Sequence, residues 1–197
     1  MPEIIAVVFD FDDTLAPDTT TAFLENWGIN PELFWREKVD SLLQQGWDPI
    51  PAYLYQMIEE SRARPPAEKI TAVRLAAFGR QTRFHKGVNS IFVKLERAAR
   101  EVYPEARLEF YVVSSGIREI IASTRISRHF KDIWASSFHC DPTSGEILFP
   151  RNIISFTDKT RYLFQISKGF VGPGFANRPF EVNRRIDPAR LRVPFSR

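Results

Sequence analysis

A run of apolar residues near the start of the chain ends abruptly in acidic ones. Residues 4–9 read Ile-Ile-Ala-Val-Val-Phe, and Asp10, Asp12 and Asp13 follow directly. A β-branched run of this length predicts a buried strand, and open α/β sheets keep their chemistry at the carboxyl ends of such strands. Carboxylates this close repel one another unless a cation or water compensates their charge. The stretch therefore predicts an active site at the end of a buried strand.

The composition is that of a globular protein. A chain of 197 residues, 44% of them hydrophobic, is long enough for one substantial core with a sizeable insertion. No apolar run approaches the roughly 18 residues that a membrane-spanning helix needs. The first residues lack the basic flank and apolar core of a secretion signal, and Cys140 is the only cysteine. We therefore expect a soluble cytoplasmic protein without internal disulfides.

The net charge of +3 is modest, but arginine is concentrated late in the chain. Glu181 and Asp187 interrupt this basic region, and no aromatic platform for nucleic-acid bases accompanies it. We expect a solvated, irregular segment and no nucleic-acid or membrane partner. The arginines concerned are Arg178, Arg184, Arg185, Arg190, Arg192 and Arg197.

The residues between this strand and Pro104 have mainly helical patterns. Residues 16–30 are rich in turn-forming residues, and apolar side chains then recur at helical spacing. Met57 and the aromatic residues on these faces are expected in the core rather than in contact with a ligand. The predicted helices cover residues 31–45, 50–62, 67–83 and 88–103.

A second strand is predicted over residues 108–113, with Ser114-Ser115-Gly116 as a polar turn before a helix over 117–127. A strand, a small polar turn and a helix offer backbone N–H groups to an anion, so a phosphate would fit there. The remaining predicted elements are a strand over 132–139, a hairpin turn over 141–145, a helix over 157–168 and a loop-like segment from 169 onward. His129, His139 and Cys140 lack the paired short spacing of a zinc site.

Three motifs, in this order, resemble those of the haloacid dehalogenase-like (HAD) phosphohydrolases. They are Asp10-Phe11-Asp12-Asp13-Thr14, Val112-Val113-Ser114-Ser115-Gly116 and Asp158-Lys159-Thr160. The resemblance covers residues 4 to about 168, and the helical stretch resembles the type-one cap of the phosphoserine-phosphatase-like branch. It implies an α/β fold with a Rossmann-like core and a parallel sheet over 1–15 and 87–168. A helical cap over 16–86 would be inserted, and 169–197 would be an irregular C-terminal segment.

The resemblance also implies catalytic roles. Asp10 would attack phosphorus and form an aspartyl-phosphate, and Asp12 would protonate the leaving oxygen and later activate water. The Asp10 carboxylate and the Asp12 backbone carbonyl would bind Mg²⁺. Lys159 would offset charge on the phosphoryl group, and we prefer it to Lys168 because Lys159 opens its helix. Asp13 would face away or cap the turn.

Substrate binding is implied for the remaining motif residues. Thr14 and Ser114 would hydrogen-bond the phosphoryl oxygens, with Ser115 and Gly116 completing the phosphate site. The partner would be a small phosphorylated substrate. The family's substrate-reading acidic residue, however, has no clear counterpart in residues 16–21, so phosphoserine is not assigned as the substrate.

The chain departs from the family pattern after Lys168, where no acidic pair follows a further apolar strand. In this fold the strand that bears the fourth motif lies beside the first strand, so its loss would uncover residues 4–9 as an apolar edge. We therefore expect a chain truncated before the fourth motif, without its C-terminal core strands. Magnesium binding and hydrolysis would then be weakened, and self-association through the uncovered edge is left open.

Three functions remain from the sequence. The first is a magnesium-dependent HAD-like phosphatase that acts on a phosphate monoester. The second is a non-catalytic phosphate-binding or regulatory module that keeps the fold. The third is a HAD-type phosphotransferase or mutase, whose cap would look similar from sequence.

Overall fold

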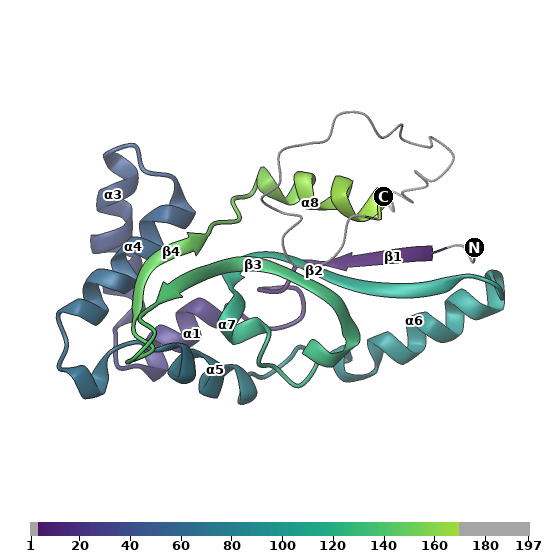
Figure 1. Ribbon diagram of the computed structural model, residues 1–197, viewed down its shortest axis with the longest axis horizontal. Coiled ribbons are helices and arrows are strands. Elements are labelled where there is room, and N and C mark those ends of the chain that lie inside the picture. Colours follow the sequence, from purple (N-terminus) through teal and green to yellow (C-terminus); the bar gives the residue numbers. More distant parts are fainter. Residues whose placement is uncertain (1–3, 170–197) are drawn as a thin grey trace.

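A computed structural model describes residues 4–169 as an α/β protein built on one four-stranded sheet (Figure 1). The strand order is β1-β2-β3-β4, with β1, β2 and β3 parallel and β4 antiparallel to β3. The strands span Ile4–Phe9, Arg107–Ile117, Phe130–Cys140 and Ile147–Asn152. The mixed α/β fold with a mainly parallel sheet is as predicted. The arginine-rich region lies outside the described residues.

Helices cover both faces of the sheet. On one face, α6 (Val88–Val102) contributes Phe92 to a cluster with Phe110 and Val112 of β2. On the other face, α8 (Asp158–Ser167) packs Tyr162 and Ile166 against β2 and β3. Figure 1 shows α8 and α6 on opposite sides of β1 and β2. Central β2 is therefore buried on both sides, which explains its nearly continuous apolar sequence.

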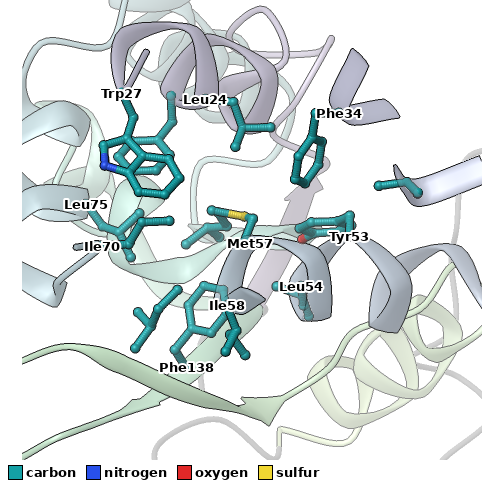
Figure 2. Close-up of a cluster of buried hydrophobic side chains, with 14 of the residues drawn as sticks. Leu24, Trp27, Phe34, Tyr53, Leu54, Met57, Ile58, Ile70, Leu75 and Phe138 are labelled. Carbon is teal, nitrogen blue, oxygen red and sulfur yellow. The ribbon is translucent and has the colours of Figure 1, made fainter. Parts of the chain in front are cut away.

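The helices between β1 and α6 form a separate cluster beyond the carboxyl ends of the strands. They bury Phe23, Leu24, Phe34, Leu54 and Met57 against one another (Figure 2). The elements are α1 (Thr19–Asn26), α2 (Pro31–Leu33), the π-helix η1 (Phe34–Val39), α3 (Asp40–Gln44), α4 (Pro49–Arg62), the 3-10 helix η2 (Pro66–Glu68) and α5 (Ala72–Arg80). The division into a core and a helical cap stays a prediction.

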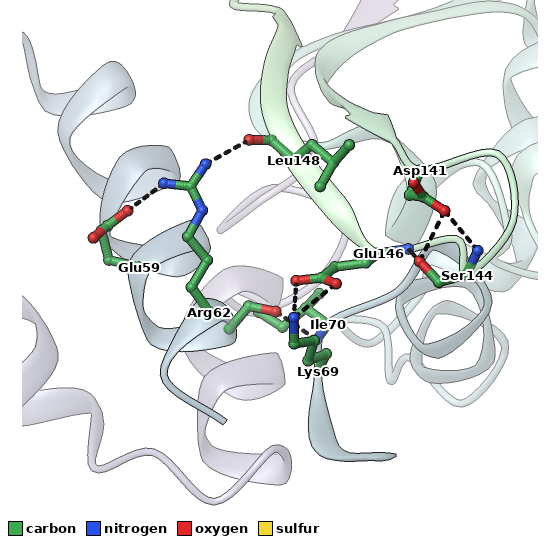
Figure 3. Close-up of polar contacts among 9 residues, drawn as sticks. Glu59, Arg62, Lys69, Ile70, Asp141, Ser144, Glu146 and Leu148 are labelled. Atoms are coloured by element: carbon green, nitrogen blue, oxygen red, sulfur yellow. Dashed lines mark hydrogen bonds and ion pairs between the residues drawn. The ribbon is translucent and has the colours of Figure 1, made fainter. Parts of the chain in front are cut away.

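The β3–β4 hairpin joins this helical cluster to the sheet. Lys69 forms an ion pair with Glu146 at 2.8 Å, and the Ile147 N–H donates to the Ile70 carbonyl at 3.1 Å. Arg62 of α4 also donates to the Leu148 carbonyl at 3.4 Å (Figure 3). The segment between α4 and α5 is thus bonded to the start of β4 by both side-chain and main-chain contacts.

Most of the predicted elements are confirmed. The helices expected over 50–62, 88–103 and 157–168 correspond to α4, α6 and α8. The predicted hairpin turn forms at Asp141, whose Oδ1 accepts from the Thr143 and Ser144 N–H groups at 2.9 and 2.8 Å. The segment over 31–45 is helical as expected, but six of its residues form the π-helix η1. The region over 67–83 divides into η2 and α5.

Three predictions about local structure are wrong. Residues 16–30 are not mainly turns, because Asp18 accepts hydrogen bonds from the Thr20 and Thr21 N–H groups and starts α1. The helix expected over 117–127 ends after one turn, since α7 spans only Arg118–Ile121 and turns and the short 3-10 helix η3 (Ser127–His129) follow. The supposed turn at residues 114–116 is also part of β2.

Strand β1 lies at one end of the sheet order in the part of the chain that the structure describes, where β2 is its partner. It carries no charged residue, and Ile4 is half exposed. Truncation before a fourth motif and self-association through this edge stay predictions. Within residues 4–169, no helix combines the length and apolar composition that crossing a bilayer requires.

Candidate active site

The structure brings Asp10 and Lys159 together across 149 positions of the chain. Asp10 follows the last residue of β1. Lys159 is the second residue of α8, and α8 packs against β2 and β3. The Lys159 ammonium donates to Asp10 Oδ2 at 2.5 Å. Asp10 Oδ1 accepts from the Phe11 N–H at 2.8 Å, and the Asp10 side chain remains 43% exposed. The carboxylate is therefore oriented by two donors and open to a ligand.

Asp12 is held in a different environment only two residues away. The chain turns sharply after Phe11, whose carbonyl accepts from the N–H groups of residues 14–16. Asp12 Oδ1 then accepts from both the backbone N–H and the hydroxyl of Thr19, at 2.8 and 2.7 Å. Thr19 is the first residue of α1, so this pair of bonds connects the loop after β1 to the start of the helical cluster.

Burial raises the pKa of the Asp12 carboxyl above its ordinary value. The Thr19 hydrogen bonds oppose this shift because they favour the ionised form, whereas the negative charges of Asp18 and Asp10 add to it. A carboxyl with a raised pKa holds a proton more of the time near neutral pH. The two aspartates thus have different environments, with an open, lysine-paired Asp10 and a half-buried Asp12 whose pKa is raised.

The residues at the end of β2 lie against Asp12, and this part of the strand is irregular. The pairing of β2 with β3 shifts register between Val113 and Ile117, so residues 114–116 form a bulge. Bulges re-aim side chains and occur often beside active sites. Ser114 is buried, and its Oγ accepts from the Gly116 N–H at 3.0 Å. The polar turn and long helix expected here are replaced by a bulged strand end and the short helix α7, and phosphate binding by Ser114, Ser115 and Gly116 stays a prediction.

Gly116 is needed here for space rather than for backbone freedom. A Cβ at this position would lie 2.1 Å from Asp12 Oδ2 and 3.3 Å from Ser114 Oγ. The Asp12 carboxylate consequently sits directly on the Gly116 backbone, between the bulge of β2 and Thr19. The Gly116 backbone therefore restricts Asp12 Oδ2, whereas the Thr19 hydrogen bonds hold Asp12 Oδ1.

Gly116→Ala is expected to lower kcat/KM by roughly 10²-fold, because the methyl group forces the Asp12 carboxyl out of position. Steady-state kinetics on an active substrate would measure the loss, with circular dichroism to check the fold. In an Asp12→Ala background the same change should have little further effect, since the clashing oxygen is gone. Equal losses in both backgrounds would show that Gly116 acts through something other than Asp12.

The other predicted site residues lie around this centre. Thr14 is exposed in the turn after Phe11, and Asp13 is exposed with a left-handed φ of 57°, as expected for a residue that faces away. The Ser115 carbonyl accepts from Tyr53, while its Oγ is buried. Lys168 follows the last residue of α8, at the opposite end from Lys159. The structure therefore places Lys159, and not Lys168, against Asp10.

Two aromatic residues of the helical cluster also reach this region, although their helical spacing suggested only a core role. The Tyr53 hydroxyl donates to the Ser115 carbonyl at 2.7 Å, and Trp35 Nε1 donates to Thr21 Oγ1 at 2.9 Å. Burial, together with the nearby charges of Asp12 and Asp18, raises the pKa of Tyr53 far above its ordinary range, so the hydroxyl stays protonated. No sequence signal distinguishes these rings from core aromatics.

The residues considered for zinc lie elsewhere. His129 stacks on Phe92 with ring centroids 4.4 Å apart, and His139 and Cys140 lie at the end of β3. Across residues 4–169, no three His, Cys, Asp or Glu side chains gather in a way that could hold a metal ion.

The mainly parallel sheet with helices on both faces is arranged as in HAD-like folds. Solved structures agree. A HAD family hydrolase from Salmonella enterica serovar Typhi matches with a TM-score of 0.59 and 11% identity, over 85% of this chain and 52% of its own. A phosphoserine phosphatase, solved as a phospho-aspartyl intermediate analogue, matches at 0.58 and 14% identity, over 84% and 72% of the two chains.

Further comparisons bear on the same fold. A phosphoserine phosphohydrolase-like protein from Francisella tularensis matches with a TM-score of 0.52 and 18% identity, over 87% of this chain and 74% of its own. An uncharacterized protein of Borreliella burgdorferi is 26% identical over 214 residues, which cover 98% of this chain and 72% of that protein. The sequence matches no model of a known protein family. The chain thus has the HAD-like fold and spans about half the length of the Salmonella hydrolase.

Proposed function

We propose that this protein is a HAD-like phosphohydrolase that cleaves phosphate monoesters through an aspartyl-phosphate on Asp10. The observation that carries the proposal is the arrangement of two unlike aspartates beside one lysine. Asp10 is open and bonded to Lys159 at 2.5 Å, whereas Asp12 is half-buried and has a raised pKa. Asp10 can therefore act as the nucleophile and Asp12, two residues further on, as the proton donor.

In the first half-reaction an Asp10 carboxylate oxygen attacks phosphorus, and the bond from phosphorus to the leaving oxygen breaks. Protonated Asp12 gives its proton to that oxygen, so the leaving group departs as an alcohol. In the second half-reaction water attacks the phosphorus of the aspartyl-phosphate and Asp12 accepts the water proton. The bond from phosphorus to the Asp10 oxygen breaks, so inorganic phosphate leaves and the Asp10 carboxylate is restored. Lys159 lowers the repulsion between the Asp10 carboxylate and the incoming phosphoryl group.

The oxygen donors of Asp10 and Asp12 fit a hard cation. A half-exposed carboxylate and a main-chain carbonyl suit Mg²⁺, which keeps several of its waters and is often bound by one or two protein carboxylates. Bound Mg²⁺ would supply positive charge that offsets the charge of the phosphoryl group. With no third acidic ligand among the described residues, we expect weak binding, in the millimolar range if at all.

The test is a thermal-shift and turnover experiment on the whole chain. Beryllofluoride imitates an aspartyl-phosphate, so with Mg²⁺ it should raise Tm, and a panel of phosphate monoesters should release inorganic phosphate. Absence of both effects would refute the proposal. A shift without phosphate release would instead support the non-catalytic phosphate-binding module. Transfer of phosphate to an added alcohol or sugar acceptor would identify a phosphotransferase or mutase.

A further inference from the structure

Thr19 supplies both hydrogen bonds that the Asp12 carboxylate accepts within residues 4–169. Its N–H donates to Asp12 Oδ1 at 2.8 Å, and its hydroxyl donates to the same oxygen at 2.7 Å. Thr19 is only 2% exposed, so bulk water has little access to these donors. The other carboxylate oxygen, Oδ2, lies against the Gly116 backbone. The orientation of the Asp12 carboxyl is therefore set by one threonine and one close contact.

Thr19 is itself fixed, because α1, the helix that it begins, is held within the helical cluster. The apolar side chains of α1 are buried in that cluster. Near the start of α1, Trp35 Nε1 donates to Thr21 Oγ1 at 2.9 Å. At its end, Trp27 Nε1 donates to the Glu68 carbonyl of η2 at 2.7 Å. A group on an element held in this way is positioned more precisely than one on a loop.

The Asp12 carboxyl acts in the proposed reaction only by moving protons. Proton transfer requires the leaving oxygen to lie within hydrogen-bond reach of the carboxyl, and a misplacement of about 1 Å can cost about 10² in rate. Asp10, by contrast, is oriented by Lys159 and by the Phe11 N–H, without any contribution from Thr19. Loss of the Thr19 hydroxyl should therefore impair protonation of the leaving group and spare the nucleophile.

We propose that Thr19 is a positioning residue that holds the Asp12 carboxyl in place to protonate the leaving oxygen. Through Thr19, the helical cluster determines the position of the proton donor, while the nucleophile belongs to the sheet. The inference rests on the proposed phosphohydrolase function and adds a residue on which its proton-transfer step depends. A threonine that only stabilised the start of α1 would affect all substrates alike. A positioning role instead predicts an effect that increases with the need of the leaving group for a proton.

Two kinds of phosphate ester test this role, because their leaving groups differ in basicity. Alkyl esters such as benzyl phosphate need a proton on the leaving oxygen, whereas aryl esters such as 4-nitrophenyl phosphate release a stable phenolate. The quantity to measure is kcat/KM, which covers only the steps up to departure of the leaving group. With the full chain and Mg²⁺, Thr19→Val should lower kcat/KM at least about tenfold for the alkyl ester and less than about threefold for the aryl ester.

Two further variants separate the hydroxyl from other effects of the substitution. Thr19→Ser keeps the hydroxyl and should retain most of the kcat/KM for the alkyl ester. Thr20→Val is the matched control, because Thr20 is the next buried residue of α1 and donates its N–H to Asp18 rather than to Asp12. It removes the same chemical group, and both kcat/KM values should stay near those of the wild type.

The possible failures are distinguishable. If the wild type cleaves both kinds of ester and Thr19→Val lowers both values equally, Thr19 has only a structural role, and the inference fails while the phosphohydrolase function stands. The same conclusion follows if Thr19→Ser is as impaired as Thr19→Val. If the wild type releases phosphate from no ester of either kind, Thr19 has no reaction to serve, and the proposed function and the inference both fail.

Discussion

Replacing Asp10 with asparagine is expected to abolish phosphate release, with a loss of at least roughly 10³-fold. The amide is a poor nucleophile and cannot form the aspartyl-phosphate. It also loses the charge that pairs with Lys159 at 2.5 Å. The stabilisation by beryllofluoride should disappear in the same variant, because no carboxylate remains to bind beryllium. Turnover assays and thermal shifts on one preparation would measure both effects.

Asp13→Asn is the matched control for this variant. It removes a carboxylate from the same loop, but Asp13 is exposed and adopts a left-handed φ of 57°, which asparagine tolerates well. Turnover and the beryllofluoride response should therefore stay close to those of the wild type. An Asp10→Asn variant that retains turnover would exclude the aspartyl-phosphate mechanism.

Asp12→Asn should reduce turnover by about 10²- to 10⁴-fold and at the same time raise Tm at neutral pH. Asparagine cannot donate or accept the catalytic proton, but its Oδ1 can still accept both Thr19 bonds. The stability gain arises because burial raises the pKa of Asp12, so that its ionised form is disfavoured in the folded protein. The variant removes that ionisation altogether.

The pH dependence of this gain follows from the direction of the shift. Below the unfolded pKa of about 3.9, Asp12 is protonated in both states and the wild type has no penalty. As pH rises through the higher folded pKa, the wild type loses stability and the asparagine variant does not. The Tm difference should therefore grow from near zero at pH 4 towards neutral pH. A difference independent of pH would contradict this explanation.

The site centre could be predicted because it depends on strand ends. The carboxyl ends of parallel strands meet at one edge, so Asp10 and Ser114 had to lie near each other. Lys159 followed from its place at the start of a helix, where its ammonium points back to the sheet. The position of Gly116 against Asp12 could not be foreseen, because it depends on a two-residue register shift between β2 and β3.

Secondary structure predicted from short stretches of sequence was wrong where tertiary contacts decide the structure. Thr19, Thr20 and Thr21 are poor helix formers, yet the Asp18 cap and the buried Phe23 and Leu24 make α1 a helix. A Ser-Ser-Gly sequence favours a turn on its own, but here it forms a bulge within β2, because Val113 and Ile117 on either side of it both pair with β3. Tyr53 has the spacing of a core residue and is indeed buried, and its hydroxyl contact with the Ser115 carbonyl could not be foreseen from that spacing.

The hydrogen bond from the Ile147 N–H to the Ile70 carbonyl links the β3–β4 hairpin to the helical cluster, so we expect the two to move together. Any movement of α4 and α5 away from the sheet must either break the main-chain bonds at Gly145 and Ile147 or carry the turn at residues 141–145 along. Amide hydrogen exchange would detect the second case as cooperative opening of α4 and the hairpin. A substitution in that distant turn would then also alter the opening of the helical cluster.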